Sequence, residues 1–291
     1  MTPAAALVML HAAVALFGFS GLFGKWLVLS PVGIVLGRTA IAAMALGILR
    51  LRSATRAPFD VRLLANGVVL ALHWASFFAA IQVSTVAVGL LGYASFPLFT
   101  LILERLVLAR RFHRREGATA VLVTAGLVLL VPELSVANPI VQGLGWGLVS
   151  GFTFALLAVM NRRWTATRTA TDIAFWQNLF AALVLLPFAW ASPWAIGTIG
   201  AREIALLVVL GLACTAFAHT MFIRAMTRVS AHTASVVAAL EPVYGIALAF
   251  AVLDEVPGPR TLAGGALIIA AAIVATRRAG RVAVGSGRSK R

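Results

Sequence analysis

The chain has 291 residues, of which 61% are hydrophobic and only 11% are charged, and its mean hydropathy is +0.99. Soluble domains average about 25% charged residues, so this composition excludes an ordinary water-soluble fold. The net charge of +15 is divided among short loops between apolar runs, which argues against a nucleic-acid-binding surface because no continuous basic face can form.

Apolar segments follow one another along the whole chain. About 20 residues at 1.5 Å rise cross a hydrocarbon core of roughly 30 Å, and ten segments approach or reach that length. The junction between the third and fourth segments is only weakly polar, so eight or nine spans is the alternative count. We expect an all-α polytopic membrane protein with spans at 4–24, 32–49, 64–83, 86–108, 117–131, 141–160, 173–191, 204–226, 233–253 and 261–275.

Two long stretches of the chain resemble each other and favour the count of ten. Residues 71–130 and 216–275 align at an offset of 145, which places Pro97 on Pro242. Weak internal duplication in an apolar chain is typical of repeat-built transporters. Five spans per half is an odd number, so the second half must enter the membrane from the opposite face. We predict two inverted five-helix repeats, at 1–135 and 136–276, followed by a basic tail at 277–291.

Lysine and arginine are distributed unevenly between the two sets of predicted loops. Of the 24 basic residues, 20 fall in loops and the tail on one side. Only Lys25, Arg202 and Arg260 fall on the opposite side, and Arg38 lies inside a span. Cytoplasmic loops carry the excess of positive charge in membrane proteins. We therefore expect both termini to be cytoplasmic.

Polar groups inside the spans are costly in hydrocarbon and normally face protein or water. His73 and Trp74 lie in the middle of the third span, where Phe77 shares a helical face with His73. His219 repeats this pattern in the second half. One interpretation is that these faces line a substrate cavity, with the imidazoles as hydrogen-bond partners or proton carriers. The other is that the two histidines tie helices together.

Glu241 and Pro242 combine a carboxylate with a helix break in the ninth span. Proline removes a backbone donor and leaves a carbonyl free near the bilayer midplane. Phe96 and Pro97 occupy the equivalent position in the first half. Both halves therefore have the helix break, but only the second half has a carboxylate beside it. We predict hinges at Pro97 and Pro242. Glu241 is either a group that binds substrate, a cation or a proton, or a structural group that stabilises the kink.

Several further side chains are candidates for the wall of a cavity. Tyr93 and Tyr244 lie close to the predicted breaks, and Trp146 and Trp176 lie inside spans. Aromatic walls suit an amphipathic organic solute better than a small inorganic ion. Arg38 either meets a substrate carboxylate, pairs with Glu241, or extends its charge outward from near the helix end; we favour a structural role.

Glycine spacing predicts close helix packing. Gly143, Gly147 and Gly151 recur every four residues on the sixth span. A stripe of this kind lets a neighbouring backbone approach closely. We therefore expect the sixth span to pack inside the bundle along this face.

The order and spacing of four short motifs resemble the drug/metabolite transporter superfamily, and within it the chain is similar to the ten-helix EamA-like exporters. The motifs are Ser30-Pro31 with Arg38, Ser95-Phe96-Pro97-Leu98-Phe99, Ala225-Met226-Thr227-Arg228-Val229-Ser230-Ala231, and Leu240-Glu241-Pro242-Val243. The resemblance implies two inverted five-helix halves around a central solute path, in a bacterial inner-membrane protein that exports amino acids, metabolites or drugs. Many members carry a glutamate after the fourth span. Glu104 comes too early for that position, so no role is transferred to it.

We therefore expect an exporter of small organic solutes that works by alternating access, with amino acids, aromatic or hydrophobic ones among them, as the expected solutes. Other metabolites or drugs are the alternative, and both downhill exchange and proton coupling stay open, with downhill exchange the simpler. The chain lacks the motifs of proteases, esterases and ATPases, so an intramembrane enzyme is disfavoured. A receptor is disfavoured because it would carry an extramembrane domain or long loops, and the longest predicted loop is under about fifteen residues. No catalytic residue, metal or cofactor is expected, and the expected partners are a small-molecule substrate and membrane lipids. The substrate-binding candidates are His73, Trp74, Phe77, Tyr93, Trp146, Trp176, His219, Glu241 and Tyr244.

Overall fold

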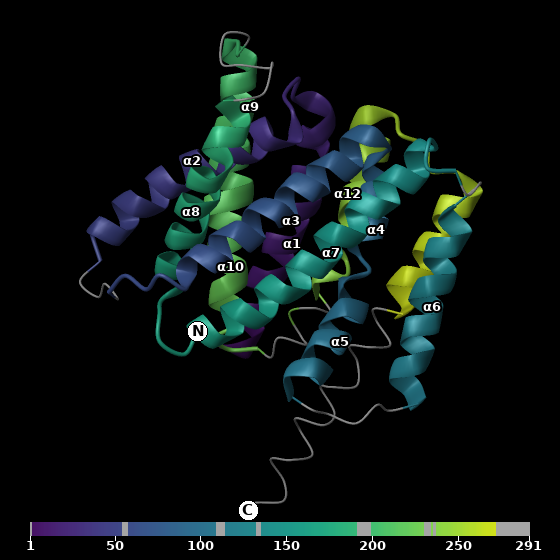
Figure 1. Cartoon of the computed structure of the whole chain (residues 1–291), viewed down its shortest axis with the longest axis horizontal. Coiled ribbons are helices and arrows are strands. Elements are labelled where there is room, and N and C mark those ends of the chain that lie inside the picture. Colours follow the sequence, from purple (N-terminus) through teal and green to yellow (C-terminus); the bar gives the residue numbers. More distant parts are fainter. Residues whose placement is uncertain are drawn as a thin grey trace, which may run out of the picture.

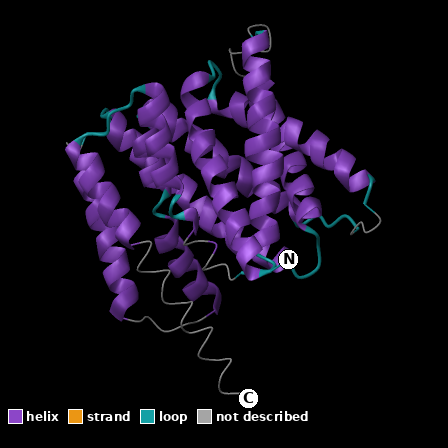
Figure 2. Cartoon of the chain, turned by 180° about the vertical axis from the view of Figure 1, so that it is seen from behind, coloured by secondary structure: helices purple, strands orange, loops and turns teal. Residues whose placement is uncertain are grey.

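The structure, a computed structural model, describes residues 2–53, 58–108, 114–131, 135–190, 199–229, 234 and 237–271. Within these ranges the chain forms helices joined by loops, without a strand (Figures 1 and 2). Six helices are long and apolar enough to cross a membrane, and they are accompanied by four shorter apolar helices at the other predicted spans. The described part of the chain therefore has the all-helical, ten-span organisation expected from hydropathy.

The helices of the first half begin where capping residues are available. Thr2 Oγ1 accepts from the Ala5 amide and Ser30 Oγ accepts from the Gly33 amide, both at 3.2 Å, which satisfies amides that a helix leaves unpaired. The predicted span at 86–108 is broken by a turn at residues 94–95. The first-half helices are α1 (Pro3–Trp26), α2 (Pro31–Leu51), α3 (Leu63–Val83), α4 (Val86–Tyr93), α5 (Phe96–Leu108) and α6 (Arg114–Leu130).

The second half repeats this order with one irregularity. The predicted span at 204–226 is a continuous helix whose middle part is a π-helix. A turn at residues 239–240 precedes Glu241, as the turn at 94–95 precedes Phe96. The predicted tail at 277–291 lies outside the described residues. The second-half helices are α7 (Pro139–Trp164), α8 (Ala170–Trp190), α9 (Ala201–Gly211), η2 (Leu212–Phe217), α10 (Ala218–Ala225), α12 (Glu241–Leu253) and the helix Pro259–Ala271.

Pairs of glycines lie where helices of the first half cross helices of the second. α1 crosses α12, α4 crosses α7, and α6 packs beside the helix Pro259–Ala271 (Figure 1). In each case a methyl group added to one glycine would lie 2.8 Å from the backbone of the other, so the two backbones are in direct contact. The pairs are Gly18 with Gly245, Gly147 with Gly92, and Gly126 with Gly264.

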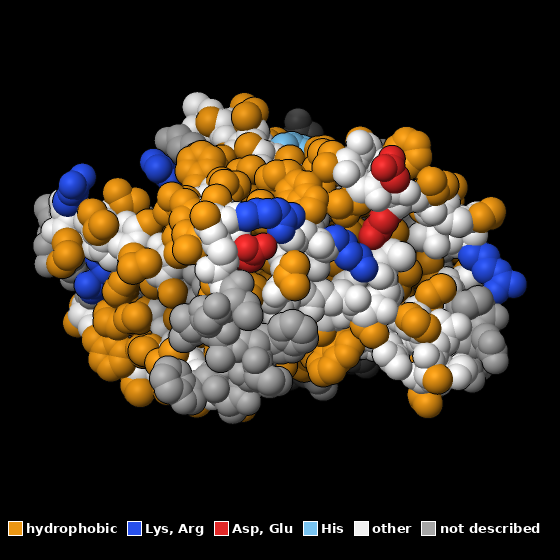
Figure 3. Space-filling model, turned by 90° about the horizontal axis from the view of Figure 1, so that it is seen from above, with side chains coloured by type: hydrophobic (Ala, Val, Ile, Leu, Met, Phe, Trp, Pro, Cys, Tyr) orange, Lys and Arg blue, Asp and Glu red, His pale blue; other side chains and the backbone are white. Residues whose placement is uncertain are grey.

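Large apolar side chains cover the outside of the helix bundle. Phe152 on α7, Phe188 on α8 and Phe250 on α12 are all exposed. Seen from above, apolar side chains are spread over the molecule, with separate charged groups between them (Figure 3). Exposed apolar surface of this extent is stable in lipid and not in water. The chain is therefore a multi-pass membrane protein.

Candidate substrate-binding site

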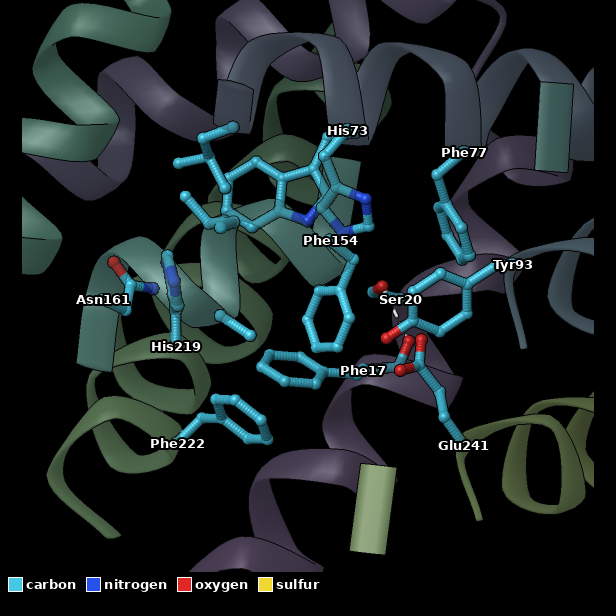
Figure 4. A pocket seen from close by; sticks show the side chains of 14 residues that line it. Phe17, Ser20, His73, Phe77, Tyr93, Phe154, Asn161, His219, Phe222 and Glu241 are labelled. Carbon is cyan, nitrogen blue, oxygen red and sulfur yellow. Dashed lines mark hydrogen bonds between the residues drawn. The ribbon is translucent and has the colours of Figure 1, made fainter. Parts of the chain in front are cut away.

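A cavity lies where helices of both halves meet (Figure 4). Its walls come from α1, α3 and α7, from the end of α4, from α10 and from the first residue of α12. The two helix breaks described above place Tyr93 and Glu241 at the cavity. The lining residues are Phe17, Ser20, Leu70, His73, Trp74, Phe77, Tyr93, Phe154, Leu157, Ala158, Asn161, His219, Phe222 and Glu241.

Aromatic rings form most of the wall. The ring centroid of Phe154 lies 5.2 Å from that of Tyr93 and 6.1 Å from that of Phe222, and Phe17 lies 5.6 Å from Phe222. The pairs are tilted or edge-on, which is the favoured packing of aromatic side chains. Because these rings come from α1, α4, α7 and α10, the wall is shared by the two halves.

Glu241 is the one acidic side chain in the lining, and it is only 4% exposed. The Tyr93 hydroxyl donates a hydrogen bond to its carboxylate. Figure 4 shows Glu241 and Tyr93 meeting on one side of the cavity, with Asn161 and His219 on the opposite side. A buried carboxylate with one neutral hydrogen-bond partner retains acceptor capacity for a cationic group.

The two histidines differ in how their Nδ1 atoms are bonded. His73 Nδ1 lies 3.0 Å from both the carbonyl and the hydroxyl oxygen of Ser150, so this histidine ties α3 to α7 while its ring lines the cavity. His219 Nδ1 is buried and has no hydrogen-bond partner within the described part of the chain. The His219 ring meets Trp74 edge-on, with the centroids 5.5 Å apart. His219 therefore has a ring nitrogen with free capacity to bind a solute.

Asn161 belongs to an amide network that ties α3, α7 and α8 together. Its Oδ1 accepts from Asn66 Nδ2 at 3.2 Å and from the Gln177 side chain. Asn66 Oδ1 in turn accepts from Trp164 Nε1 at 2.9 Å. Interhelical hydrogen bonds between amides stabilise helix packing in membranes. The network fixes the position of the Asn161 end of the cavity.

Arg38 lies behind the cavity wall and is fully buried. Its guanidinium carbon lies 4.0 Å from the centre of the Trp74 ring, and its Nε donates to Thr215 Oγ1 at 2.8 Å. The alternative in which Arg38 extends its charge outward from near the helix end is wrong, because the side chain is buried. Within the described residues Arg38 also forms no ion pair with Glu241.

The structure brings six of the predicted binding residues to the cavity: His73, Trp74, Phe77, Tyr93, His219 and Glu241. It places the other three elsewhere. Trp146 is 47% exposed on the outside of α7. Trp176 stacks on Phe180, with the ring centroids 5.5 Å apart. The Tyr244 hydroxyl lies 3.5 Å from His11 Nδ1, outside the cavity lining.

Sequence reasoning did not identify Phe17, Ser20, Phe154 or Asn161 as lining residues. Phe17 and Phe154 are two of 17 phenylalanines in the chain, and nothing in their local pattern separates them from the others. Asn161 falls just past the predicted span at 141–160, where a side-chain amide can reach water, so its position carried no signal. Ser20 bonds its own helix through the Phe17 carbonyl at 2.7 Å, so its polarity alone indicates no site.

The described fold and cavity agree with comparisons to known families. The EamA-like transporter family model matches residues 4–131 and matches again at 141–277. The chain belongs to the EamA-like transporter family. Its two matches confirm the repeated halves inferred from the offset of Pro97 and Pro242. As an EamA-family protein, the chain is a membrane transporter of small metabolites and not an enzyme.

Relatives of this EamA-family protein are named for different solutes. It is 28% identical to the pseudopaline exporter CntI of Pseudomonas aeruginosa over 216 residues, which is 74% of each chain. It is 26% identical to the S-adenosylmethionine uptake transporter of Rickettsia prowazekii over 212 residues, or 72% of this chain and 69% of that one. A solved crystal structure with 21% identity covers 95% of the chain with a TM-score of 0.68, which supports the fold.

Proposed function

We propose that this EamA-family protein exports amino acids, especially those with aromatic or apolar side chains, across a bacterial inner membrane. The observation that supports this most is the chemistry of the cavity, an aromatic wall around a single buried carboxylate. The rings of Phe154, Tyr93 and Phe222 match an apolar side chain. The Glu241 carboxylate matches an ammonium group, because a charge leaving water needs a charged or strongly polar partner.

In this proposal the ammonium group of the solute binds Glu241 in place of, or beside, the Tyr93 hydroxyl. The cavity lies between the halves, so rocking of the halves exposes it first to one side of the membrane and then to the other. Pro97 and Pro242, each the second residue of a helix that follows a break, are the proposed hinges. The excess of basic residues in one set of loops supports a cytoplasmic location for both termini.

A second candidate is export or uptake of a larger metabolite. One relative is named for pseudopaline export and another for S-adenosylmethionine uptake. Both solute and direction therefore differ among relatives, and each must be measured for this chain. A panel of solutes that varies the amine and the apolar group separately distinguishes this candidate from amino acid export.

The test is counterflow in proteoliposomes that contain the purified protein. Vesicles loaded with unlabelled phenylalanine should accumulate labelled phenylalanine transiently, and apolar amino acids should compete better than small polar ones. Glu241→Gln should raise the apparent KM by about 10-fold or more, because a hydrogen bond to a charged group contributes about 1.5–3 kcal/mol. Glu203→Gln is the matched control, since Glu203 pairs with Arg202 outside the cavity. Absence of competition by every amino acid would contradict the proposal and favour the second candidate.

A further inference from the structure

Arg38 carries a positive charge in the middle of the bundle and touches a wall residue of the cavity. It is 1% exposed and projects from α2 toward the π-helix η2. Its Nε donates to Thr215 Oγ1 at 2.8 Å, and one terminal nitrogen, Nη2, donates to the Cys214 carbonyl at 3.4 Å. Thr215 Oγ1 donates in turn to the Leu210 carbonyl at 2.7 Å, which fixes its position.

The π-helix provides these acceptors. A π-helical segment shifts the backbone hydrogen-bond register, and such segments frequently occur at functional sites. Here the segment presents a threonine hydroxyl and a backbone carbonyl to the same guanidinium. Arg38 is therefore held by neutral groups that orient it without neutralising its charge.

The guanidinium has unused binding capacity. Its other terminal nitrogen, Nη1, is buried without a hydrogen-bond partner in the described part of the chain. No carboxylate forms an ion pair with Arg38 among the described residues. An unpaired buried charge and an unsatisfied donor are both costly. A group that is retained in this state is a candidate to bind a ligand.

The indole of Trp74 packs against Arg38 and also lines the cavity. The guanidinium carbon lies 4.0 Å from the Trp74 ring centre, within the range of a cation–π contact. The same Trp74 lines the cavity and meets His219, whose buried Nδ1 also lacks a partner. His219 lies across the cavity from Glu241 (Figure 4). One side of the cavity thus offers a carboxylate, and on the other the Trp74 ring contacts Arg38 and His219, each of which has a buried nitrogen without a partner in the described part of the chain.

We propose that Arg38 binds the anionic group of the transported solute, which reaches it when the Trp74 indole turns aside, with His219 as a second donor. The inference rests on the proposed function, because it completes the recognition of a zwitterion whose ammonium group binds Glu241. A guanidinium binds a carboxylate with two parallel hydrogen bonds, which a single neutral amide cannot reproduce. The protein should therefore distinguish an acid from its uncharged amide.

The test measures binding to the purified full-length protein in detergent, from the shift of its thermal unfolding midpoint with ligand concentration. The probes are phenylalanine, phenylalaninamide, 3-phenylpropionate and 3-phenylpropionamide. The dissociation constant of each acid should be lower than that of its amide by about 10-fold or more. Phenylalanine and 3-phenylpropionate differ only in the amine, so the ratio of their affinities tests the ammonium site at Glu241 separately.

Variants then assign the acid selectivity to a residue. Arg38→Gln should bring the acid and the amide within about two-fold of each other, and Arg38→Lys should retain part of the selectivity because it keeps the charge. Arg52→Gln is the charge-matched control, since Arg52 lies just past the end of the same helix and is exposed. If Arg38→Gln unfolds more readily yet keeps the full acid selectivity, Arg38 is purely structural and the proposal is wrong.

The outcomes for the two proposals are distinguishable. Equal binding of acids and amides by the unmodified protein overturns the role of Arg38, even if neither Arg38 variant folds. In that case tighter binding of phenylalanine than of 3-phenylpropionate still supports the ammonium site. Acid selectivity without an effect of the amine supports Arg38 and contradicts amino acid export. Absence of binding by all four probes contradicts both.

Discussion

Phe154 joins the two halves of the protein at the cavity. Its ring contacts Tyr93 and Phe96 from the first half and Phe222 from the second, with ring centroids 5.0–6.1 Å apart. Phe152, two residues earlier on the same helix, is 42% exposed and contacts Phe99 instead. The two phenylalanines therefore separate the effect of the cavity wall from the effect of an aromatic residue on α7.

We predict that Phe154→Leu weakens solute binding and Phe152→Leu does not. Leucine keeps most of the apolar volume and loses the ring contacts, which contribute about 0.5–1.5 kcal/mol per aromatic pair. The apparent KM for counterflow of an aromatic amino acid should rise by roughly 3- to 10-fold in Phe154→Leu. Equal KM values for the two variants would show that the aromatic wall does not contact the solute.

Some cavity residues are predictable from the sequence, because their side-chain chemistry and their position on the helix indicate the same site. His73 and Phe77 share a helical face, and Tyr93 and Glu241 flank the breaks, so all four reach the cavity. Trp146 has the same chemistry but faces outward. The rotation of α7 is set by its glycine stripe, since Gly147 must face Gly92, and the partner of that stripe cannot be read from the sequence.

At the scale of helices, the α4–α7 crossing depends on the absence of side chains. A methyl group on Gly147 would lie 2.8 Å from Gly92 Cα and 3.1 Å from the Tyr93 amide nitrogen. These neighbours are backbone atoms, which cannot move away as a side chain can. Gly145 lies on the same helix, and a methyl group there would meet nothing within 4 Å.

Gly147→Ala should therefore destabilise the protein, by roughly 1–3 kcal/mol if the helices separate to relieve the overlap. Gly145→Ala should be neutral or stabilising by up to about 1 kcal/mol, because alanine favours the helix more than glycine does. The check is the thermal unfolding midpoint of each purified variant in detergent. A Gly147→Ala variant as stable as Gly145→Ala would mean that the crossing is looser than the structure shows.

One end of the bundle is held together by two polar contacts, one between the halves and one within the first half. The Val86 amide at the start of α4 donates to Glu255 Oε2 at 3.0 Å, and Glu255 belongs to the loop after α12. Lys25 Nζ at the end of α1 donates to the Ser84 carbonyl at 2.6 Å. Both contacts lie on the side predicted to be extracytoplasmic. Glu255 places a carboxylate at a helix N-terminus, which is electrostatically favourable.

We predict that Glu255→Ala loosens this closure. Removal of the carboxylate costs about 0.3–1 kcal/mol at the α4 terminus, so amides at Val86–Ala87–Val88 should exchange hydrogen roughly 2- to 5-fold faster in mass-spectrometric measurements. Glu203→Ala is the control, because Glu203 is also an acidic residue in a first helical turn but contacts Arg202. Unchanged exchange in Glu255→Ala would show that other contacts close this end.

The positions of the helices were predictable from the sequence. The positions at which the helices are interrupted were predictable only in part. Hydropathy located all ten spans, since crossing a bilayer demands a long apolar run. Pro97 and Pro242 indicated where two spans break. The π-helix at Leu212–Phe217 carried no such signal. Its Thr215 hydroxyl accepts a hydrogen bond from Arg38, a residue 177 positions away, and a tertiary contact of this kind is not reported by local propensity.

At the scale of the whole molecule, the repeated halves are predictable and their contacts are not. The offset between Pro97 and Pro242 identified two copies, and the family matches at 4–131 and 141–277 confirm them. Which helices cross between the copies depends on the shapes of both surfaces. The structure identifies the crossing helices, because it places Gly18 against Gly245 and Gly126 against Gly264. The sequence alone does not pair these glycines.

The orientation of the molecule in the membrane can be predicted from its basic residues. An even number of spans puts both termini on the same side, and 20 of the 24 basic residues fall in loops on that side, so both termini should be cytoplasmic. Alkaline phosphatase fused after Arg291 should be inactive, because that enzyme needs the oxidising periplasm. A fusion that truncates the chain after Pro257, in the loop of Glu255, should be active. The opposite pattern would invert the molecule, place the Glu255 contact on the cytoplasmic side, and reverse which end of the bundle opens to release the solute.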